Sequence, residues 1–173
     1  MLVKTKAIVI SSIKFQEKSL IVKCFTQSHG LKSYFVRDAF SGRKSNQKIA
    51  YFQPLSILEI EAVHKNKGTL ENFKEIKLST PFQTIHSDIY KSTIVIFISE
   101  ILYHSIHEEE KNDSLFSFLE TALLIDLRFD NDQKIFHVIE RQIILKVLIE
   151  YYTYHLDGFK RPKSLEVLKE VFS

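Results

Sequence analysis

The chain is organised around residues 31–48, which read LKSYFVRDAFSGRKSNQK. The first seven residues alternate in the manner of a β-strand. One face of this strand would hold Leu31, Ser33, Phe35 and Arg37, and the other would hold Lys32, Tyr34 and Val36. A loop around residues 41–42 follows, and the aromatic and basic side chains there are Phe40, Arg43, Lys44, Lys48 and Tyr51. Bases stack on aromatic rings and phosphates pair with cations, so this mixture predicts a site for single-stranded nucleic acid. The alternative is a half-buried strand followed by a solvated basic loop.

Composition indicates one generous domain or two small ones with a well-filled core. The 173 residues are 45% hydrophobic and include 14 Phe and 7 Tyr, which argues against global disorder. The single cysteine, Cys24, excludes an intrachain disulfide and a four-cysteine zinc site, and favours a reducing, cytoplasmic location. The N-terminal apolar run has no cleavage site of a signal peptide, and the apolar run 94–98 is far shorter than a bilayer span. We therefore expect a soluble protein without a membrane partner.

The net charge of +3 hides an uneven distribution. Residues 1–80 contain 14 Lys/Arg and 6 Asp/Glu, a charge of +8, whereas residues 81–173 contain 10 and 15, a charge of −5. A basic half joined to an acidic half indicates an anion-binding module attached to a module of another kind.

The first half is predicted to form five β-strands. Their expected ranges are Val3–Ser12, Ser19–Thr26, Leu31–Arg37, Phe52–Val63 and Leu70–Leu78. Gly30 can take the positive φ of a hairpin turn between the second and third strands. Side chains expected on the inner face of the fourth strand are Leu58, Ile60 and Ala62. Five meandering strands in about 80 residues fit a small barrel of the oligonucleotide-binding (OB) type.

The periodicity becomes helical after Thr80 and Pro81. Four helices are expected at Asp88–His107, Asp113 or Ser114 to Arg128, Gln133–His155 and Leu165–Val171. The core positions expected on the third helix are Phe136, Ile139, Ile143, Leu148 and Tyr152. The predicted fold is therefore α+β, with a five-stranded OB-type β-barrel at residues 1–80 and an α-helical bundle at residues 81–173.

Candidate catalytic and metal sites are weak. His104 and His107 share a helix face near Glu108 and Glu110, yet matched ligands from a second helix are missing, so a solvated helix end is the preferred interpretation. Cys24 lies in mid-strand among apolar residues and is expected to behave as a small buried hydrophobe. Four scattered glycines form no phosphate-binding loop. We expect neither an enzyme nor a metal site, and no cofactor.

The remaining constellation is basic and aromatic. Residues expected to contact phosphates are Lys14, Lys23, Lys32, Arg37, Arg43, Lys44 and Lys48, and those expected to stack on bases are Tyr34 and Phe40. On neighbouring strands, Lys23 and Lys32 would line one groove near Tyr34, giving sequence-tolerant binding that weakens with salt. The alternative is that these lysines are ordinary surface charges.

Long segments of the chain resemble the RecO family of bacterial recombination and repair proteins. The matching segments are KAIVISSIKFQEKSLIVKCFTQSHGLKSYFVRDA, FQPLSILEIEAVHKNKGTLENFKEIK, IYKSTIVIFISEILYHSIHEEEKNDSLFSFLE and YYTYHLDGFKRPKSLEVLKEVF. The last of these is similar to the C-terminal end of Bacteroidetes-like members. The chain departs from the family in being shorter, with the shortening placed inside its helical half, and in lacking the cysteines of a zinc element. After the third strand, where the family often has a glycine and a basic residue, this chain has Asp38, which weakens the local positive field.

The resemblance implies a DNA-binding mediator of recombinational repair. Such a protein binds single- and double-stranded DNA, anneals complementary strands, and acts with RecR to load the RecA recombinase on DNA coated by single-strand-binding protein. It implies no nucleotide hydrolysis and a cytoplasmic, nucleoid-associated location. The shortened helical half leaves an alternative open, a protein-interaction OB module without annealing activity.

Overall fold

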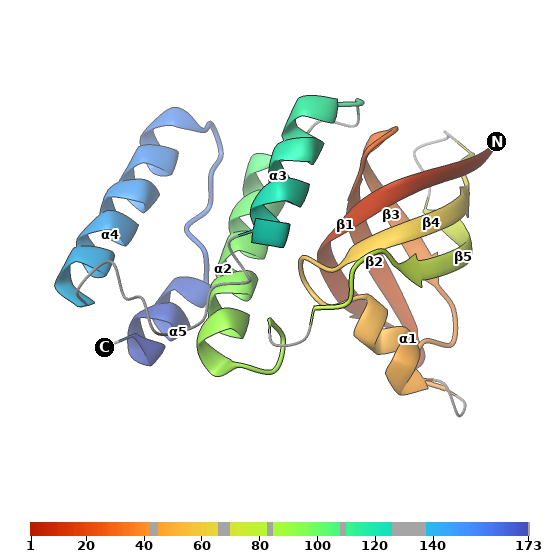
Figure 1. The fold of residues 1–173 in the computed structure, drawn as a ribbon, viewed down its shortest axis with the longest axis horizontal. Helices are drawn as coiled ribbons and strands as arrows, with labels where there is room; N and C mark the ends of the chain where they lie inside the picture. Colours follow the sequence, from red (N-terminus) through yellow and green to blue (C-terminus); the bar gives the residue numbers. More distant parts are fainter. Residues whose placement is uncertain (42–44, 66–69, 83–84, 108–109, 126–137, 173) are drawn as a thin grey trace.

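Five strands close into a barrel in the order β1-β2-β3-β5-β4 in the computed structural model (Figure 1). The strands are β1 (Leu2–Phe15), β2 (Ser19–Thr26), β3 (Gly30–Val36), β4 (Ile57–Val63) and β5 (Glu71–Leu78). All neighbours are antiparallel except β3 and β5, which are parallel. The structure describes residues 1–173 apart from 42–44, 66–69, 83–84, 108–109, 126–137 and 173. A closed five-stranded barrel followed by helices confirms the predicted α+β fold with an OB-type barrel.

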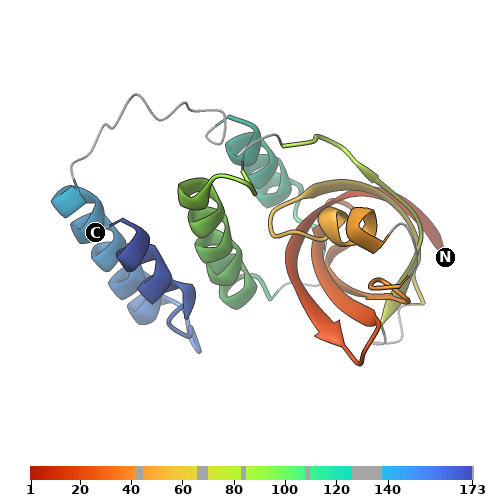
Figure 2. The ribbon, with the colours of Figure 1, turned by 90° about the horizontal axis from the view of Figure 1, so that it is seen from below.

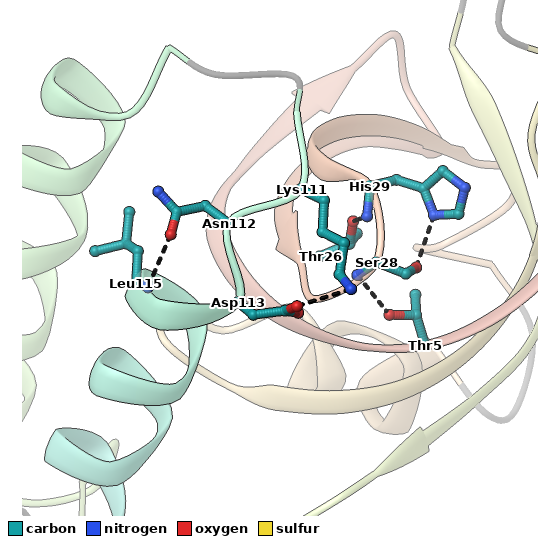
Figure 3. Close-up of polar contacts among 8 residues, drawn as sticks. All are labelled: Thr5, Thr26, Ser28, His29, Lys111, Asn112, Asp113 and Leu115. Carbon is teal, nitrogen blue, oxygen red and sulfur yellow. Dashed lines mark hydrogen bonds and ion pairs between the residues drawn. The ribbon is translucent and has the colours of Figure 1, made fainter.

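The barrel interior is filled by the alternate residues of its strands. Side chains buried there together include Leu20, Val22, Cys24, Tyr34, Phe52, Leu58, Ile60 and Ala62. The inner face predicted for the fourth strand is thus confirmed, and so is the buried thiol. The β2–β3 turn uses Gly30 at φ 61°, and within it the hydroxyl of Thr26 accepts from the backbone N–H of His29 at 3.1 Å (Figure 3).

A second apolar core lies on the outside of the barrel. The outward side chains of Ile8, Phe25 and Leu31 pack there against two helices, α2 (Ile89–Ser105) and α3 (Asp113–Ile125). The rings of Phe25 and Phe116 have centroids 6.0 Å apart across this junction. Strands β1 to β3 are therefore apolar on both faces, because one face fills the barrel and helices cover part of the other.

A β-bulge joins the barrel to α2. The pairing of β1 with β2 shifts between Val9 and Ser11, so Ile10 stands outside the ladder. The buried hydroxyl of Ser99 on α2 donates to the carbonyl of Ile10. Since an unpaired buried carbonyl is costly, this hydrogen bond satisfies the group that the bulge sets free.

Helix α2 is central, as its all-round apolar pattern predicts. In Figures 1 and 2 it lies between the barrel and the pair α4 (Val138–His155) and α5 (Ser164–Val171). A third core cluster joins Phe97 of α2 to Ile149 of α4 and Leu165 of α5. The carboxylate of Glu100 on α2 accepts from the backbone N–H of Lys163 at 2.7 Å and of Ser164 at 2.8 Å, which caps α5.

Several helical predictions are wrong in detail. On α4 the expected core residues Ile143 and Leu148 are 57% and 44% exposed, and Ile149 is buried instead. This helix is apolar on more than one side, so its pattern does not reveal the inward face. Its predicted residues 133–137, like residues 126–128 of the helix before it, lie outside the described residues. On α3 the capping side chain is Asn112, which accepts from the N–H of Leu115 at 3.0 Å (Figure 3).

The link between β3 and β4 also differs from prediction. It contains a short helix, α1 (Ser45–Tyr51), where a basic loop was expected, and α1 lies across one end of the barrel (Figure 2). The strand expected from Phe52 starts only at Ile57. Before it, Leu55 takes a φ of 61° and its N–H donates to the carbonyl of Val9 at 2.8 Å. These tertiary contacts override the extended conformation that the local sequence favours.

Candidate nucleic-acid interface

A groove opens where β3 and β5 separate. The two strands pair only at Tyr34 with Glu71 and at Phe35 with Asn72, and α1 lies beside the gap. The groove has a volume of about 610 Å³, within the range of about 300–1,000 Å³ that is usual for ligand sites. Its lining residues are Phe35, Val36, Arg37, Lys48, Tyr51, Phe52, Asn72, Phe73, Lys74 and Ile76.

The charges that line the groove are all positive. Arg37 comes from the end of β3, Lys48 from α1 and Lys74 from β5, and none of the described residues that line the groove is acidic. In the described part of the chain, no carboxylate lies within ion-pair distance of Arg37 or Lys48. The ammonium of Lys74 is 2.6 Å from the carboxylate of Glu61, and this hydrogen bond raises the pKa of Lys74. Arg37 and Lys48 are thus the cations best placed to take a phosphate.

Stacked aromatic rings support the groove from inside the barrel. The centroids of Tyr34 and Phe73 are 4.2 Å apart with the rings 15° from parallel, and those of Phe73 and Phe52 are 5.7 Å apart. Tyr34 and Phe52 are buried, while Phe73 is half-buried and reaches the groove. Phe35 and Tyr51, both half-buried, add two further aromatic walls.

The aromatic and basic character continues beyond the groove onto the β1–β2 turn. Phe15 contacts Phe35 edge-to-face with centroids 6.1 Å apart. The ammonium of Lys14 lies 5.3 Å from the centroid of the Phe40 ring, and both Phe15 and Phe40 are exposed. We call this surface the aromatic–basic face, and its members are Lys14, Phe15, Phe35, Arg37, Phe40, Lys48, Tyr51 and Lys74. Exposed rings beside cations are the chemistry that suits a single strand of nucleic acid.

The structure brings together only part of the predicted set. Arg37 and Lys48 line the groove, and Lys14 contacts Phe40. Arg43 and Lys44 lie outside the described residues.

The predicted wall of Lys23, Lys32 and Tyr34 does not form. Tyr34 is fully buried in the barrel and offers no face to a base. Lys32 is paired in register with Cys24, whereas Lys23 lies on the opposite face of the sheet, 4.5 Å from the ring centroid of Tyr103 on α2. The physical reason is that helices cover part of the outer face of β2 and β3, and the inner face belongs to the core.

Tyr34 has a structural role instead. Its hydroxyl is hydrogen-bonded to Nε2 of the buried His64 at 2.9 Å. Among the described residues, Nδ1 of His64 is a buried atom without a hydrogen-bond partner, and the ring of His29 packs edge-to-face at 4.9 Å. Burial, followed by the charge of His29, lowers the pKa of His64. Burial likewise raises the pKa of Tyr34.

Of the ten described residues that line the groove, eight were not predicted as site residues, and the four that matter most for binding are Phe35, Tyr51, Phe73 and Lys74. Phe35 was read only as a strand position and Tyr51 only as a neighbour of the basic loop. Phe73 and Lys74 belong to β5, which reaches the groove through its parallel pairing with β3. No local sequence pattern predicts this strand pairing, because the paired residues are 37 positions apart in the chain.

The described residues contain neither a helix suited to a membrane nor a cluster suited to a metal ion. In the ranges that the structure describes, no helix combines the length and apolar character needed to cross a bilayer. In the same ranges, no three His, Cys, Asp or Glu side chains gather as a metal site would require.

Comparisons with known proteins agree along the chain. Residues 1–82 match the family described as Recombination protein O N terminal, and residues 86–139 match Recombination protein O C terminal. The chain is 57% identical to a protein of Flavobacterium johnsoniae and 58% identical to one of Flavobacterium psychrophilum, each named DNA repair protein RecO, with both chains covered completely. A protein of that name from Christiangramia forsetii is 30% identical, over 99% of this chain and all of the relative.

The alignments contain more positions than this chain has residues. The alignment with the Flavobacterium johnsoniae protein spans 237 positions, whereas the chain has 173 residues. The difference of 64 positions falls inside an alignment that covers both chains completely. An internal shortening is therefore confirmed, and its predicted place inside the helical half stays a prediction.

Proposed function

This chain belongs to the Recombination protein O family of DNA repair proteins, and from that premise we propose that it binds DNA through its aromatic–basic face. It acts without catalysing a reaction, anneals complementary single strands, and assists recombinase loading together with RecR and single-strand-binding protein. The family resemblance drawn from the sequence is confirmed; these individual activities and partners form the proposal.

The observation that carries the proposal is that the described lining of the groove contains three cations and no carboxylate. Phosphates need fixed positive charge, and Arg37 and Lys48 supply it without an acidic partner among the described residues. Bases need aromatic faces, and Phe35 and Tyr51 line the same groove. The outer face of β2 and β3, a common OB binding surface, is partly covered by α2 and α3. DNA is therefore expected at the groove and the adjoining β1–β2 turn.

The residues of the barrel favour binding over catalysis. The one cysteine, Cys24, is buried inside it, and burial raises the pKa of its thiol, which makes it a poor nucleophile. The buried His64 is held by Tyr34 within the same interior. Neither group lines the groove.

Salt-dependent binding tests the proposal. We expect an Arg37→Ala/Lys48→Ala variant to bind single-stranded DNA more weakly than the parent protein. The slope of log affinity against log salt should fall by about 1.4, since each phosphate contact on a single strand contributes about 0.7. An Arg161→Ala/Lys160→Ala variant removes the same charge from exposed positions on the helical half and serves as the control. Equal affinity and equal slope for the parent and the groove variant would remove Arg37 and Lys48 from the interface.

A second candidate is a protein-interaction module without annealing activity. Two facts about the chain favour it. The chain lacks 64 positions of the alignment with the Flavobacterium johnsoniae protein, and its match to the C-terminal family model ends at residue 139. Annealing of complementary oligonucleotides, followed with and without the protein, separates the two. The DNA-binding proposal predicts acceleration, and the alternative predicts the uncatalysed rate.

A further inference from the structure

The groove is more than a basic patch, because it has depth and an apolar lining. Its ten lining residues comprise four aromatic and two aliphatic side chains beside three cations and one asparagine. A site that contacted only phosphates would need the cations alone. The volume of about 610 Å³ leaves room for a group larger than a water cluster or a single anion.

The inner side of the groove is held in place by the core. Phe73 stacks on Tyr34, whose hydroxyl is tied to His64, and also packs against the buried Phe52. Rings fixed in this way lose little conformational freedom when a ligand binds. The half-buried side chains of Phe35 and Tyr51 line the same groove, one from β3 and one from the last turn of α1.

The polar groups stand beside this aromatic surface. Arg37 follows directly after β3, one residue beyond Val36, and Lys48 lies one helical turn before Tyr51. A ligand that combines a flat apolar ring with an anionic group on either side would match both parts. An unstacked nucleotide of single-stranded DNA has this chemistry, whereas a duplex keeps its bases paired and stacked.

We propose that the groove takes up an unstacked base of single-stranded DNA against Phe35 and Tyr51, with the flanking phosphates on Arg37 and Lys48. The inference rests on the proposed DNA binding and deepens it. Bases then contribute to affinity as well as phosphates, so the protein prefers single strands to duplex DNA of equal length. A protein that holds bases unpaired keeps them available for a complementary strand.

Oligonucleotides without bases provide the test. Fluorescence anisotropy would compare an oligothymidylate with an abasic oligonucleotide of equal length and equal phosphate number, both on the unaltered protein. We expect the oligothymidylate to bind about five-fold more tightly or better, the effect of stacking at least one base. We expect Tyr51→Leu and Phe35→Leu each to reduce this ratio, and Tyr51→Phe, which retains the ring, to preserve it.

The control substitution is Tyr154→Leu, since Tyr154 is 84% exposed on α4, far along the chain from the groove. It should leave the ratio unchanged. Equal binding of both oligonucleotides by the unaltered protein would overturn the base-binding inference and leave DNA binding intact. A ratio retained in both leucine variants would also overturn it, because the bases would then bind elsewhere. Failure to bind either oligonucleotide would instead overturn the proposed function itself.

Discussion

Replacing Tyr34 by phenylalanine tests whether this residue belongs to the barrel interior. The substitution keeps the ring that stacks on Phe73 and removes only the hydroxyl that is 2.9 Å from Nε2 of His64. Among the described residues, Nδ1 of His64 already lacks a hydrogen-bond partner. In the variant Nε2 also loses its hydrogen bond to the hydroxyl of Tyr34, while the imidazole stays buried. Stability should therefore fall while the groove keeps its shape.

The expected loss follows from leaving a buried polar group unsatisfied. That cost is about 1–3 kcal/mol, and in a chain of this size each kcal/mol lowers Tm by about 2–4 °C. Tm should fall by about 2–12 °C. Thermal and urea unfolding measure the loss of stability. Circular dichroism is the signal to follow, because the chain has no tryptophan for fluorescence. Tyr154→Phe, at a residue that is 84% exposed, is the matched control and should stay within about 0.5 kcal/mol of the parent protein.

A double-mutant cycle then isolates the pair. In a His64→Leu background the hydroxyl of Tyr34 has lost this partner, so removing it should cost less than in the parent protein. The coupling should lie in the range of about 0.5–3 kcal/mol found for contacting residues. Unchanged stability of Tyr34→Phe would refute the buried hydrogen bond. Weaker DNA binding at unchanged stability would show that the hydroxyl faces the ligand.

Three further predictions concern the links between the barrel and the helices and the effect of pH. The pKa of His64 is lowered below 6.5 in the folded protein, so the unfolded chain binds protons more readily. The free energy of unfolding should therefore be flat above pH 6.5 and fall as pH drops below 6.5, and His64→Leu should reduce this fall. Burial alone would raise the pKa of Glu100, but hydrogen bonds from Ser164 and the backbone lower this pKa from 4.5. The stabilisation that the carboxylate gives should therefore be lost as pH falls below 4.5. Glu100→Ala should lower the free energy of unfolding by about 0.5–2 kcal/mol at neutral pH, measured by urea unfolding. Ser99→Ala should cost about 1–3 kcal/mol because the carbonyl of Ile10 loses its buried donor, and an unaltered urea midpoint would contradict this.

Local spacing was enough to predict that five strands form and which residues of the fourth strand face inward. Alternation at every second residue placed Leu58, Ile60 and Ala62 on one face, and all three are buried in the barrel. Gly30 occupies the left-handed turn that the sequence predicts. These features depend on neighbours in the chain and on backbone sterics, so a single sequence contains them.

The faces of β3 and α4 could not be assigned in the same way. Tyr34, which shares a strand face with Lys32 and Val36, was expected to stack on bases, yet it fills the interior. β3 carries apolar groups on both faces, since Leu31 packs outward against the helices. On α4, Ile143 and Ile149 are equally apolar, and only packing against α2 and α5 selects Ile149. The short helix α1 was missed because its sequence, SNQKIAY, has little apolar periodicity.

The sequence by itself determined the class of the molecule: a basic barrel of five strands, an acidic helical half, an internally shortened chain and a family. Only the tertiary structure decided which aromatic and basic side chains share a surface. The groove depends on parallel strands β3 and β5 parting after two paired positions, and on α1 lying beside them. Contacts of this kind join residues far apart in the chain, and their energies come from packing, which the order of residue types along one strand does not record.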